Sequence, residues 1–213
     1  MRLVLPKLYV ILDAALIPSD ELDVALKLAD AGVRLLQYRN KSVSPRHTFE
    51  TAKRLASHLS PRGVSFIVND RPDIAALAGA TGVHVGQDDL DVDSARRVVG
   101  TDKCVGVSTH NVEQFQQAVA TSADYVAVGP IFPTESKTNP DPTVGVDFIR
   151  NVRTLTQKPI VAIGGITLEN APAVIEAGAD SVAVISDILR APNPVERARR
   201  YLTVLDSVKH AAV

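Results

Sequence analysis

The sequence predicts an α/β protein, a single (β/α)8 TIM barrel, and three observations support this fold class. Short apolar runs without polar alternation recur along the chain, as is typical of parallel strands buried on both faces. A segment with helical periodicity follows each run. Eight such units occur with no linker or charge block between them, so we expect residues 1–213 to form one closed barrel domain.

The elements can be assigned in order from these patterns. We expect strands at 8–13, 34–39, 65–70, 82–86, 104–108, 125–131, 160–166 and 181–186. We expect helices at 19–31, 45–59, 71–79, 93–99, 112–121, 146–155, 168–177 and 195–209. Ser19 is expected to cap the first helix, and Ser44 with Pro45 to begin the second. The long loop 133–144 is expected to be functional.

The composition limits the classes of partner. Apolar residues make up 46% of the chain, charged residues 22%, and the net charge is -1, which excludes a disordered chain and disfavours a nucleic-acid binder. The apolar stretch 3–12 is interrupted by Pro6 and Lys7, so no signal or membrane segment is expected. The single cysteine, Cys104, suits a reducing cytoplasm. The oligomeric state stays open, and a homo-oligomer is compatible with these features.

The last two strands predict a phosphate-binding site. Gly164 and Gly165 follow the seventh strand, and Ser186 follows the eighth. Glycines let backbone N–H groups approach an anion, and the N-termini of the following helices are expected to add partial positive charge. In (β/α)8 barrels, phosphate is frequently bound by the loops after these two strands.

Polar residues follow the other strands, at the end of the barrel where active sites lie. Gln37, Arg39 and Lys41 are alternate residues and therefore share one face of the second strand. The further candidates follow the third to sixth strands: Asn69, Asp70, Asp89, Ser108, His110, Thr134, Ser136 and Lys137. Cations from separate loops opposite a glycine turn predict a clamp for two phosphorylated groups.

Asp70 and Asp89 are the candidate metal ligands. They follow neighbouring strands, and two carboxylates completed by water suit Mg²⁺, whereas the sequence has no thiolate or histidine set for zinc. The alternative is that Asp70 caps the helix that begins at Arg71 and Pro72, and that Asp88 or Asp89 caps the next turn. His84 is expected to be a core histidine, and His110 fits either a cap or acid–base chemistry. Glu135 is assigned no role.

With these residues in place, the chain resembles the thiamine phosphate synthase family nearly from end to end. The matching segments occur in order along the repeated units: 8–13, 37–41, 69–71, 82–90, 106–110, 129–134 with Lys137, and 162–166. The resemblance implies coupling of 4-amino-2-methyl-5-(diphosphooxymethyl)pyrimidine to 4-methyl-5-(2-phosphooxyethyl)thiazole, with magnesium and release of diphosphate. The partners are then two phosphorylated small molecules.

The resemblance also implies roles for particular residues. Gln37, Arg39, Lys41, Asn69, Ser108 and Lys137 would hold the pyrimidine diphosphate, with Arg39, Lys41, Ser108 and Lys137 acting in catalysis. Asp70 and Asp89 would bind magnesium. The thiazole phosphate would be held by Thr134, Ser136, Gly165, Ile185 and Ser186. Ser136 stands where threonine is common in the family and keeps the hydroxyl group.

The implied chemistry is a dissociative transfer that needs no general base and no covalent enzyme intermediate. Loss of diphosphate leaves a stabilised pyrimidinylmethyl cation, which the thiazole nitrogen attacks. Charge neutralisation and close placement of the rings are the tasks left to the protein.

Three alternatives remain open. The first is a thiazole tautomerase of the same fold, which needs a proton shuttle. The second is another phosphate-binding barrel isomerase or aldolase, and the third is a non-catalytic barrel that binds thiazole phosphate.

Overall fold

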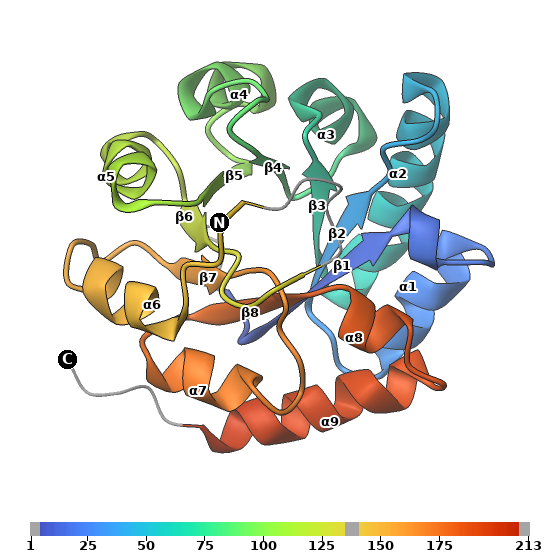
Figure 1. The fold of residues 1–213 in the computed structure, drawn as a ribbon. Coiled ribbons are helices and arrows are strands. Elements are labelled where there is room, and N and C mark those ends of the chain that lie inside the picture. The colour runs from blue at the N-terminus through green and yellow to red at the C-terminus, as the bar shows by residue number, and fades with distance from the viewer. Residues whose placement is uncertain (1–4, 135–140, 209–213) are drawn as a thin grey trace.

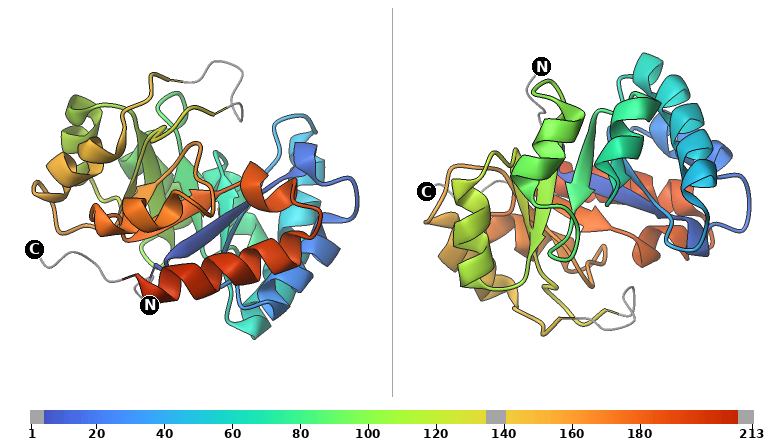
Figure 2. Two further views of the ribbon diagram at one scale, coloured as in Figure 1. Left: turned by 60° about the horizontal axis from the view of Figure 1, so that its bottom comes forward. Right: turned by 90° about the horizontal axis from the view of Figure 1, so that it is seen from above.

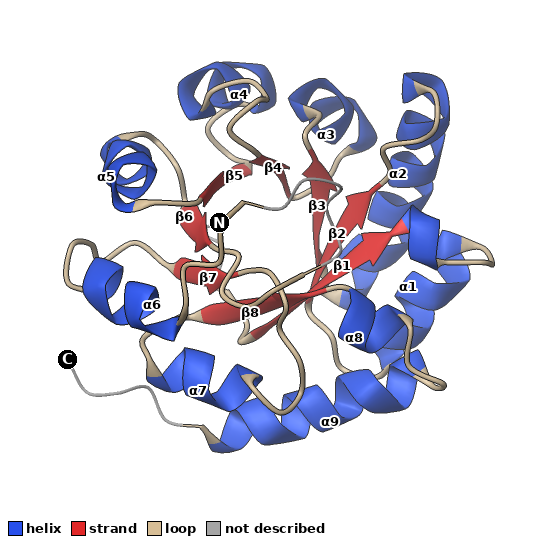
Figure 3. Cartoon of the chain, viewed as in Figure 1, coloured by secondary structure: helices blue, strands red, loops and turns tan. Residues whose placement is uncertain are grey.

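The structure, a computed structural model, describes residues 5–134 and 141–208 and contains a closed barrel of parallel strands (Figures 1 and 3). The strands are β1 Leu8–Asp13, β2 Leu35–Arg39, β3 Ser65–Asn69, β4 Gly82–Val85, β5 Cys104–Thr109, β6 Tyr125–Val128, β7 Ile160–Ala162 and β8 Ser181–Val184. They pair in chain order, and β8 closes the barrel on β1. The predicted (β/α)8 fold is confirmed.

Helices surround the barrel as an outer layer (Figure 2). They are α1 Glu21–Asp30, α2 Pro45–Leu59, α3 Pro72–Ala78, α4 Val92–Val99, α5 Val112–Ala120, α6 Val146–Arg153, α7 Ala171–Glu176, α8 Ser186–Leu189 and α9 Pro194–Ser207. Two short 3-10 helices, η1 Ala14–Leu16 and η2 Ser60–Arg62, follow β1 and α2. The sequence patterns missed η1, η2 and α8.

Most helix ends agree with their sequence signals, but the first cap is displaced by one residue. The cap of α1 is Asp20, whose carboxylate accepts a hydrogen bond from Leu22 N at 3.1 Å. The expected Ser19 cap is therefore wrong, because the adjacent carboxylate takes that position. Ser44 caps α2 as predicted, and its hydroxyl accepts from His47 N.

Burial on both faces of the sheet explains the continuous apolar strands. Val182 and Val184 of β8 pack outward against the helix layer, whereas Ala183 between them faces the barrel interior. Tyr9 and Tyr125 are the two tyrosines in the interior cluster, and both are fully buried. Within the described residues, no helix is both long and apolar enough to cross a membrane.

Candidate active site

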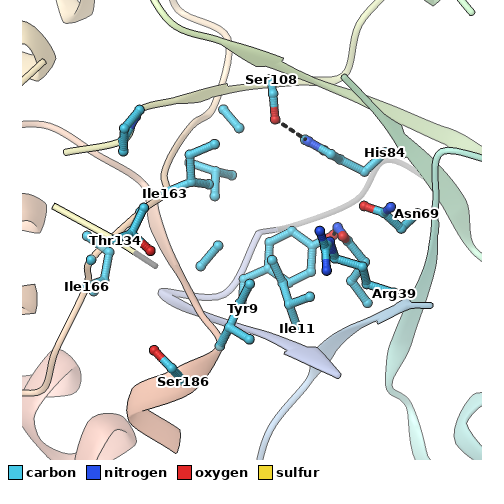
Figure 4. Close-up of a pocket in the computed structure, with 18 of the residues that line it drawn as sticks. Tyr9, Ile11, Arg39, Asn69, His84, Ser108, Thr134, Ile163, Ile166 and Ser186 are labelled. Carbon is cyan, nitrogen blue, oxygen red and sulfur yellow. Dashed lines mark hydrogen bonds between the residues drawn. The ribbon is translucent and has the colours of Figure 1, made fainter. Parts of the chain in front are cut away.

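A pocket opens at the carboxyl ends of the barrel strands, the end at which the sequence predicts function (Figure 4). Eight of the predicted site residues line it: Gln37, Arg39, Asn69, Ser108, Thr134, Gly165, Ile185 and Ser186. They come from several strands that are far apart in the sequence, and closure of the barrel brings them together. Ser136 and Lys137 lie outside the described residues, as does Glu135.

The end of β2 supplies the cationic side of the pocket. Arg39 is ion-paired with Asp13 at the end of β1, and the two side chains are 19% and 8% exposed. Asp13 and Arg39 are direct partners in the register between β1 and β2, which places the charges side by side. The sequence analysis missed Asp13, although its place at the end of the first strand was a usable signal. The pair orients the guanidinium in the wall of the pocket.

Gln37 lies deeper, at the floor. Its side chain is 2% exposed, and its amide nitrogen donates a hydrogen bond to the Tyr9 hydroxyl at 2.6 Å. One amide donor is therefore committed to the protein, while the amide carbonyl remains an acceptor.

An adjoining hollow contains Lys41 and Asp70, and Asn69 lines both this hollow and the main pocket. The Lys41 ammonium lies 2.9 Å from Asp70 Oδ2. Asp70 has φ 63°, a left-handed backbone conformation that a residue with a Cβ seldom adopts. Such conformations concentrate at functional sites because the surrounding structure must enforce them.

Asp89 lies next to Asp70 and shares its charge environment. Burial raises the pKa of Asp89, a hydrogen bond donated by Gly86 N lowers it, and the neighbouring Asp70 raises it further. The Gly86 N to Asp89 Oδ2 distance is 2.7 Å. Two carboxylates held this close carry an excess of negative charge, which Lys41 offsets only in part.

The expected helix cap at Asp70 is wrong, whereas Asp89 does bind the backbone of its own turn through Gly86 N. The residue at the cap position of α3 is Arg71, and no side chain makes a capping bond there. Asp91 caps α4, with its carboxylate accepting from Ser94 N at 2.9 Å. Asp70 and Asp89 are thus not needed as helix caps.

The donor set fits a magnesium ion better than a zinc ion. No group of three or more histidine, cysteine, aspartate or glutamate side chains with metal-site spacing occurs in the described part of the chain. A cation here would therefore take two carboxylates and complete its shell with water or ligand oxygens, which is how Mg²⁺ is commonly held. Burial and, to a smaller extent, Asp70 raise the pKa of Asp89, so the two carboxylates are close enough to interact.

The glycine turn after β7 forms the opposite end of the pocket. Gly165 has φ 64°, and a Cβ there would come within 2.5 Å of Pro133 O, so only glycine fits the close approach of the loop after β6. Asn170 Nδ2 donates to Gly165 O at 3.0 Å and holds the turn. Gly165 and Ser186 also line a second hollow with Arg190, a cation that the sequence analysis missed.

One part of the predicted phosphate site is corrected. Helix α7 begins at Ala171, after a turn at 167–170, so no helix N-terminus directly follows the glycine pair. Ser186 is the first residue of the short helix α8 and lies in the pocket wall. At this end of the pocket, the groups available to an anion are the glycine turn, Ser186 and Arg190 in the adjoining hollow.

His84 is buried and hydrogen-bonded as expected, but it also lines the pocket. Its Nε2 lies 2.8 Å from Ser108 Oγ and its Nδ1 lies 2.9 Å from the Tyr125 hydroxyl. Figure 4 shows the His84 and Ser108 side chains pointing toward each other. The core interpretation of His84 was therefore incomplete.

His110 also lines the pocket and does not cap a helix. Asn111 caps α5, and its side chain accepts from Gln114 N at 2.9 Å. His110 Nδ1 donates to the Gly129 carbonyl at 2.5 Å, and its Nε2 lies 3.3 Å from Asp141 Oδ2. His110 thus connects β5, the end of β6 and the loop before α6.

Comparisons with known proteins agree with this fold and point to one family. The family model described as thiamine monophosphate synthase matches residues 8–188. A thiamine-phosphate synthase of Koribacter versatilis is 53% identical over 208 residues, covering 95% of this chain and 97% of that protein. The thiamine-phosphate synthase of Shouchella clausii is 41% identical over 187 residues, covering 88% and 90%. The structure of a thiamine phosphate pyrophosphorylase from Pyrococcus furiosus superposes with a TM-score of 0.86 at 30% identity, covering 95% and 96%.

Proposed function

The chain belongs to the thiamine monophosphate synthase family, and from this premise we propose that it is a transferase that makes thiamine phosphate. It joins the pyrimidinylmethyl group of the diphosphate substrate to the nitrogen of the thiazole phosphate and releases diphosphate. The observation that carries the proposal is the single pocket that gathers eight of the predicted binding residues from across the barrel.

The pyrimidine diphosphate is assigned to the side of the pocket formed by β2 to β5. Gln37 offers an amide carbonyl to the amino group of the pyrimidine, since one amide N–H is already committed to Tyr9. We assign the diphosphate to Arg39 and Lys41 with Asn69 and Ser108, since these residues line the pocket or the hollow beside it. Lys137 is assigned to the same group by the family resemblance alone.

The thiazole phosphate is assigned to the opposite side. Thr134, Gly165, Ile185 and Ser186 line this side, and Arg190 adds positive charge to the adjoining hollow. Ser136 belongs to this set by resemblance. Between the two ends the pocket is apolar, with Ile11 and Ile163 among its walls, which suits two flat rings.

Asp70 and Asp89 would hold magnesium beside the diphosphate. When bound, the ion would neutralise charge on the leaving group. The chain's own residues would supply the rest, because Arg39 and Lys41 add positive charge on the diphosphate side and the main pocket has apolar walls.

The proposed mechanism is dissociative, with no general base and no covalent enzyme intermediate. Attack by an unprotonated thiazole nitrogen requires no proton removal. The protein orients the two rings and stabilises the departing diphosphate. Detection of a protein-bound pyrimidine adduct by mass spectrometry during turnover would count against it.

The other candidates fit the site less well. A tautomerase needs a proton shuttle and has no use for paired carboxylates beside a cationic clamp. A Schiff-base aldolase needs a buried lysine, and the buried residues in the described ranges include no lysine. A non-catalytic thiazole-phosphate-binding barrel would need only the glycine end of the pocket.

We also propose a cytoplasmic location, because Cys104 is a buried free thiol. The absence of a nucleic-acid partner belongs to the same proposal, while the oligomeric state stays open. The net charge of -1 supports this absence.

The direct test is to mix both substrates with the protein and magnesium and to measure diphosphate and thiamine phosphate together. We expect equimolar formation of the two products and none when either substrate is left out. Isomerisation of thiazole phosphate without diphosphate release would identify a tautomerase. Thiazole phosphate binding with no product would identify a non-catalytic barrel.

Asp89→Ala tests the metal assignment. We expect turnover to fall at least about a hundredfold, because leaving-group stabilisation of this kind contributes several kcal/mol. The affinity for thiazole phosphate, measured by calorimetry, should stay within about twofold. Asp88→Ala, which removes an exposed neighbouring carboxylate, is the matched control and should leave turnover unchanged. Equal turnover in the two variants would remove Asp89 from the mechanism.

A further inference from the structure

A buried chain of hydrogen bonds crosses the barrel interior and ends at Ser108 in the pocket. It runs from Gln37 through Tyr9, Tyr125 and His84 to Ser108, and we refer to these five residues as the buried chain. The Gln37 Nε2 to Tyr9 oxygen distance is 2.6 Å, and the two tyrosine oxygens lie 3.2 Å apart. Tyr125 then reaches His84 Nδ1 at 2.9 Å, and His84 Nε2 reaches Ser108 Oγ at 2.8 Å.

The strand register explains how a tyrosine of β6 reaches a histidine of β4. Gly106 on the intervening strand is the partner of His84 on one side and of Tyr125 on the other. Because Gly106 has no side chain, the Tyr125 ring crosses over it and stacks on the His84 ring, with centroids 5.5 Å apart. A Cβ at Gly106 would overlap the Tyr125 ring.

The direction of the buried chain follows from its first donor. The Gln37 amide nitrogen can only donate, so the Tyr9 oxygen accepts. The single Tyr9 proton finds its acceptor in the Tyr125 oxygen, and the Tyr125 proton then finds its acceptor in His84 Nδ1. The reverse order beyond Tyr9 would leave the Tyr9 proton without an acceptor in a fully buried site, where an unmade hydrogen bond is strongly unfavourable.

Both tyrosine hydroxyls keep their protons at neutral pH. Burial raises the pKa of Tyr9 and that of Tyr125. Each therefore acts as one donor and one acceptor in the buried chain.

The protonation of His84 is thereby set. With Nδ1 accepting, the neutral imidazole carries its proton on Nε2 and donates it to Ser108 Oγ. The Ser108 hydroxyl proton then points away from His84, and Ser108 lines the pocket.

We propose that Tyr9, Tyr125 and His84 are positioning residues that fix the Ser108 hydroxyl as a hydrogen-bond donor to an anionic oxygen in the pocket. The identity of that oxygen, a diphosphate oxygen of the pyrimidine substrate, rests on the proposed function. The direction of the hydrogen bonds in the buried chain does not rest on the proposed function.

The direction of the hydrogen bond between His84 and Ser108 decides between two chemical roles for Ser108. If Ser108 donated to His84, the two residues would form the serine–histidine arrangement of an activated nucleophile. With His84 donating, the histidine has no lone pair for the serine proton and cannot act as its base. Ser108 therefore binds and does not attack.

The first test reads the tautomer of His84 without any substrate. The full chain is labelled with ¹⁵N at its five histidines, and the His84 signals are assigned by their loss in His84→Asn. Long-range ¹H–¹⁵N correlation should show a proton on Nε2 and none on Nδ1. A proton on Nδ1, alone or together with one on Nε2, would overturn the proposal.

Tyr125→Phe and its matched control Tyr201→Phe extend this test. Loss of the Tyr125 hydroxyl should move the His84 Nδ1 resonance toward that of a nitrogen without a hydrogen bond. Tyr201→Phe removes the same atom from another buried tyrosine, whose hydroxyl donates to Asp187 at 2.6 Å, and should leave the resonance unchanged. An equal response in both variants would show that Tyr125 does not act on His84. If Tyr125→Phe fails to fold, the tautomer in the parent protein still decides.

A double-mutant cycle tests whether Tyr125 acts through Ser108. We expect Tyr125→Phe to lower kcat about tenfold in the parent, as for loss of one oriented hydrogen bond to a charged group, and less than about twofold in Ser108→Ala. If the fold-decreases in kcat from Tyr125→Phe and Ser108→Ala simply multiplied in the double variant, the positioning role would be overturned. If the parent protein released no diphosphate although the His84 tautomer was as predicted, that result would contradict the proposed function and leave the direction of the buried chain supported.

Discussion

Gly106→Ala probes the connection between barrel packing and the pocket with a single methyl group. The added Cβ would overlap Cζ, Cε2 and the hydroxyl of Tyr125, well inside the 3.0 Å that real Cβ contacts respect. Tyr125 is fully buried, so its ring cannot move into solvent. Relief therefore requires a shift of the ring or of the strands that hold it.

The size of the effect can be worked out from this overlap. Carbon atoms pack at about 3.5–4.0 Å, so the ring must retreat by about 1 Å or more. Overpacking of this kind costs about 1–3 kcal/mol. For a chain of this size each kcal/mol lowers Tm by about 2–4 °C, so we expect a decrease of about 2–12 °C. The same shift would lengthen the 2.9 Å contact between Tyr125 and His84 beyond hydrogen-bond range.

Urea unfolding followed by circular dichroism measures the cost, and ¹⁵N spectra of His84 report the broken contact. Tyr125→Leu is the matched background, because it removes the ring atoms that the new Cβ would meet. In that background Gly106→Ala should cost less than half as much as in the parent. A Gly106→Ala protein as stable as the parent, with an unchanged His84 spectrum, would refute the packing argument.

Two further predictions concern titrating groups. Because burial and Asp70 raise the folded-state pKa of Asp89, its deprotonation costs more in the folded chain, and magnesium-free protein should lose stability as pH rises from the ordinary value of 3.8 through the raised one. Asp89→Asn should lack this loss in urea titrations across that window, and pH profiles that stay parallel to those of the parent would contradict the shift. Burial also raises the pKa of the Cys104 thiol, so the native protein should resist iodoacetamide at pH 8 and react once unfolded. Mass spectrometry of the two samples checks this, and equal labelling would show that the thiol is exposed.

The sequence predicts the barrel and most of the pocket because both depend on local patterns. Strands buried on both faces give continuous apolar runs, and a closed barrel brings their carboxyl ends to one mouth. Arg39, Ser108 and Gly165 could therefore be placed in one site without coordinates. All three line the pocket.

Interactions across the barrel could not be predicted in the same way. Tyr9 and Tyr125 belong to β1 and β6, which are not neighbours in the sheet, and their contact depends on the width of the closed barrel. The contact between His84 and Ser108 has another origin, because β4 and β5 are neighbours and the register that pairs His84 with Gly106 brings Ser108 beside it. The displaced cap at Asp20 has a different cause, since Ser19 and Asp20 are both good caps and only the path of the chain selects between them.

The helix after β7 shows a third kind of limit. The apolar pattern of 168–177 predicts a helix close to the glycine pair, yet a turn stabilised by Asn170 comes first and delays the helix to Ala171. A short turn and the start of a helix are both marked in the sequence by residues such as Thr and Asn, so the sequence does not distinguish them. The phosphate site therefore loses the helix N-terminus expected after β7, whereas α8 begins at Ser186 directly after β8.

The proposed reaction requires the carboxylate pair and the glycine turn to act together at one barrel mouth. The most direct measurement is anomalous diffraction from a crystal of the protein grown with Mn²⁺, diphosphate and thiamine phosphate. We predict a manganese peak between Asp70 and Asp89 in contact with diphosphate, and the phosphate of thiamine phosphate at Gly165 and Ser186. Manganese bound away from both carboxylates, or the product phosphate outside the pocket, would contradict the account.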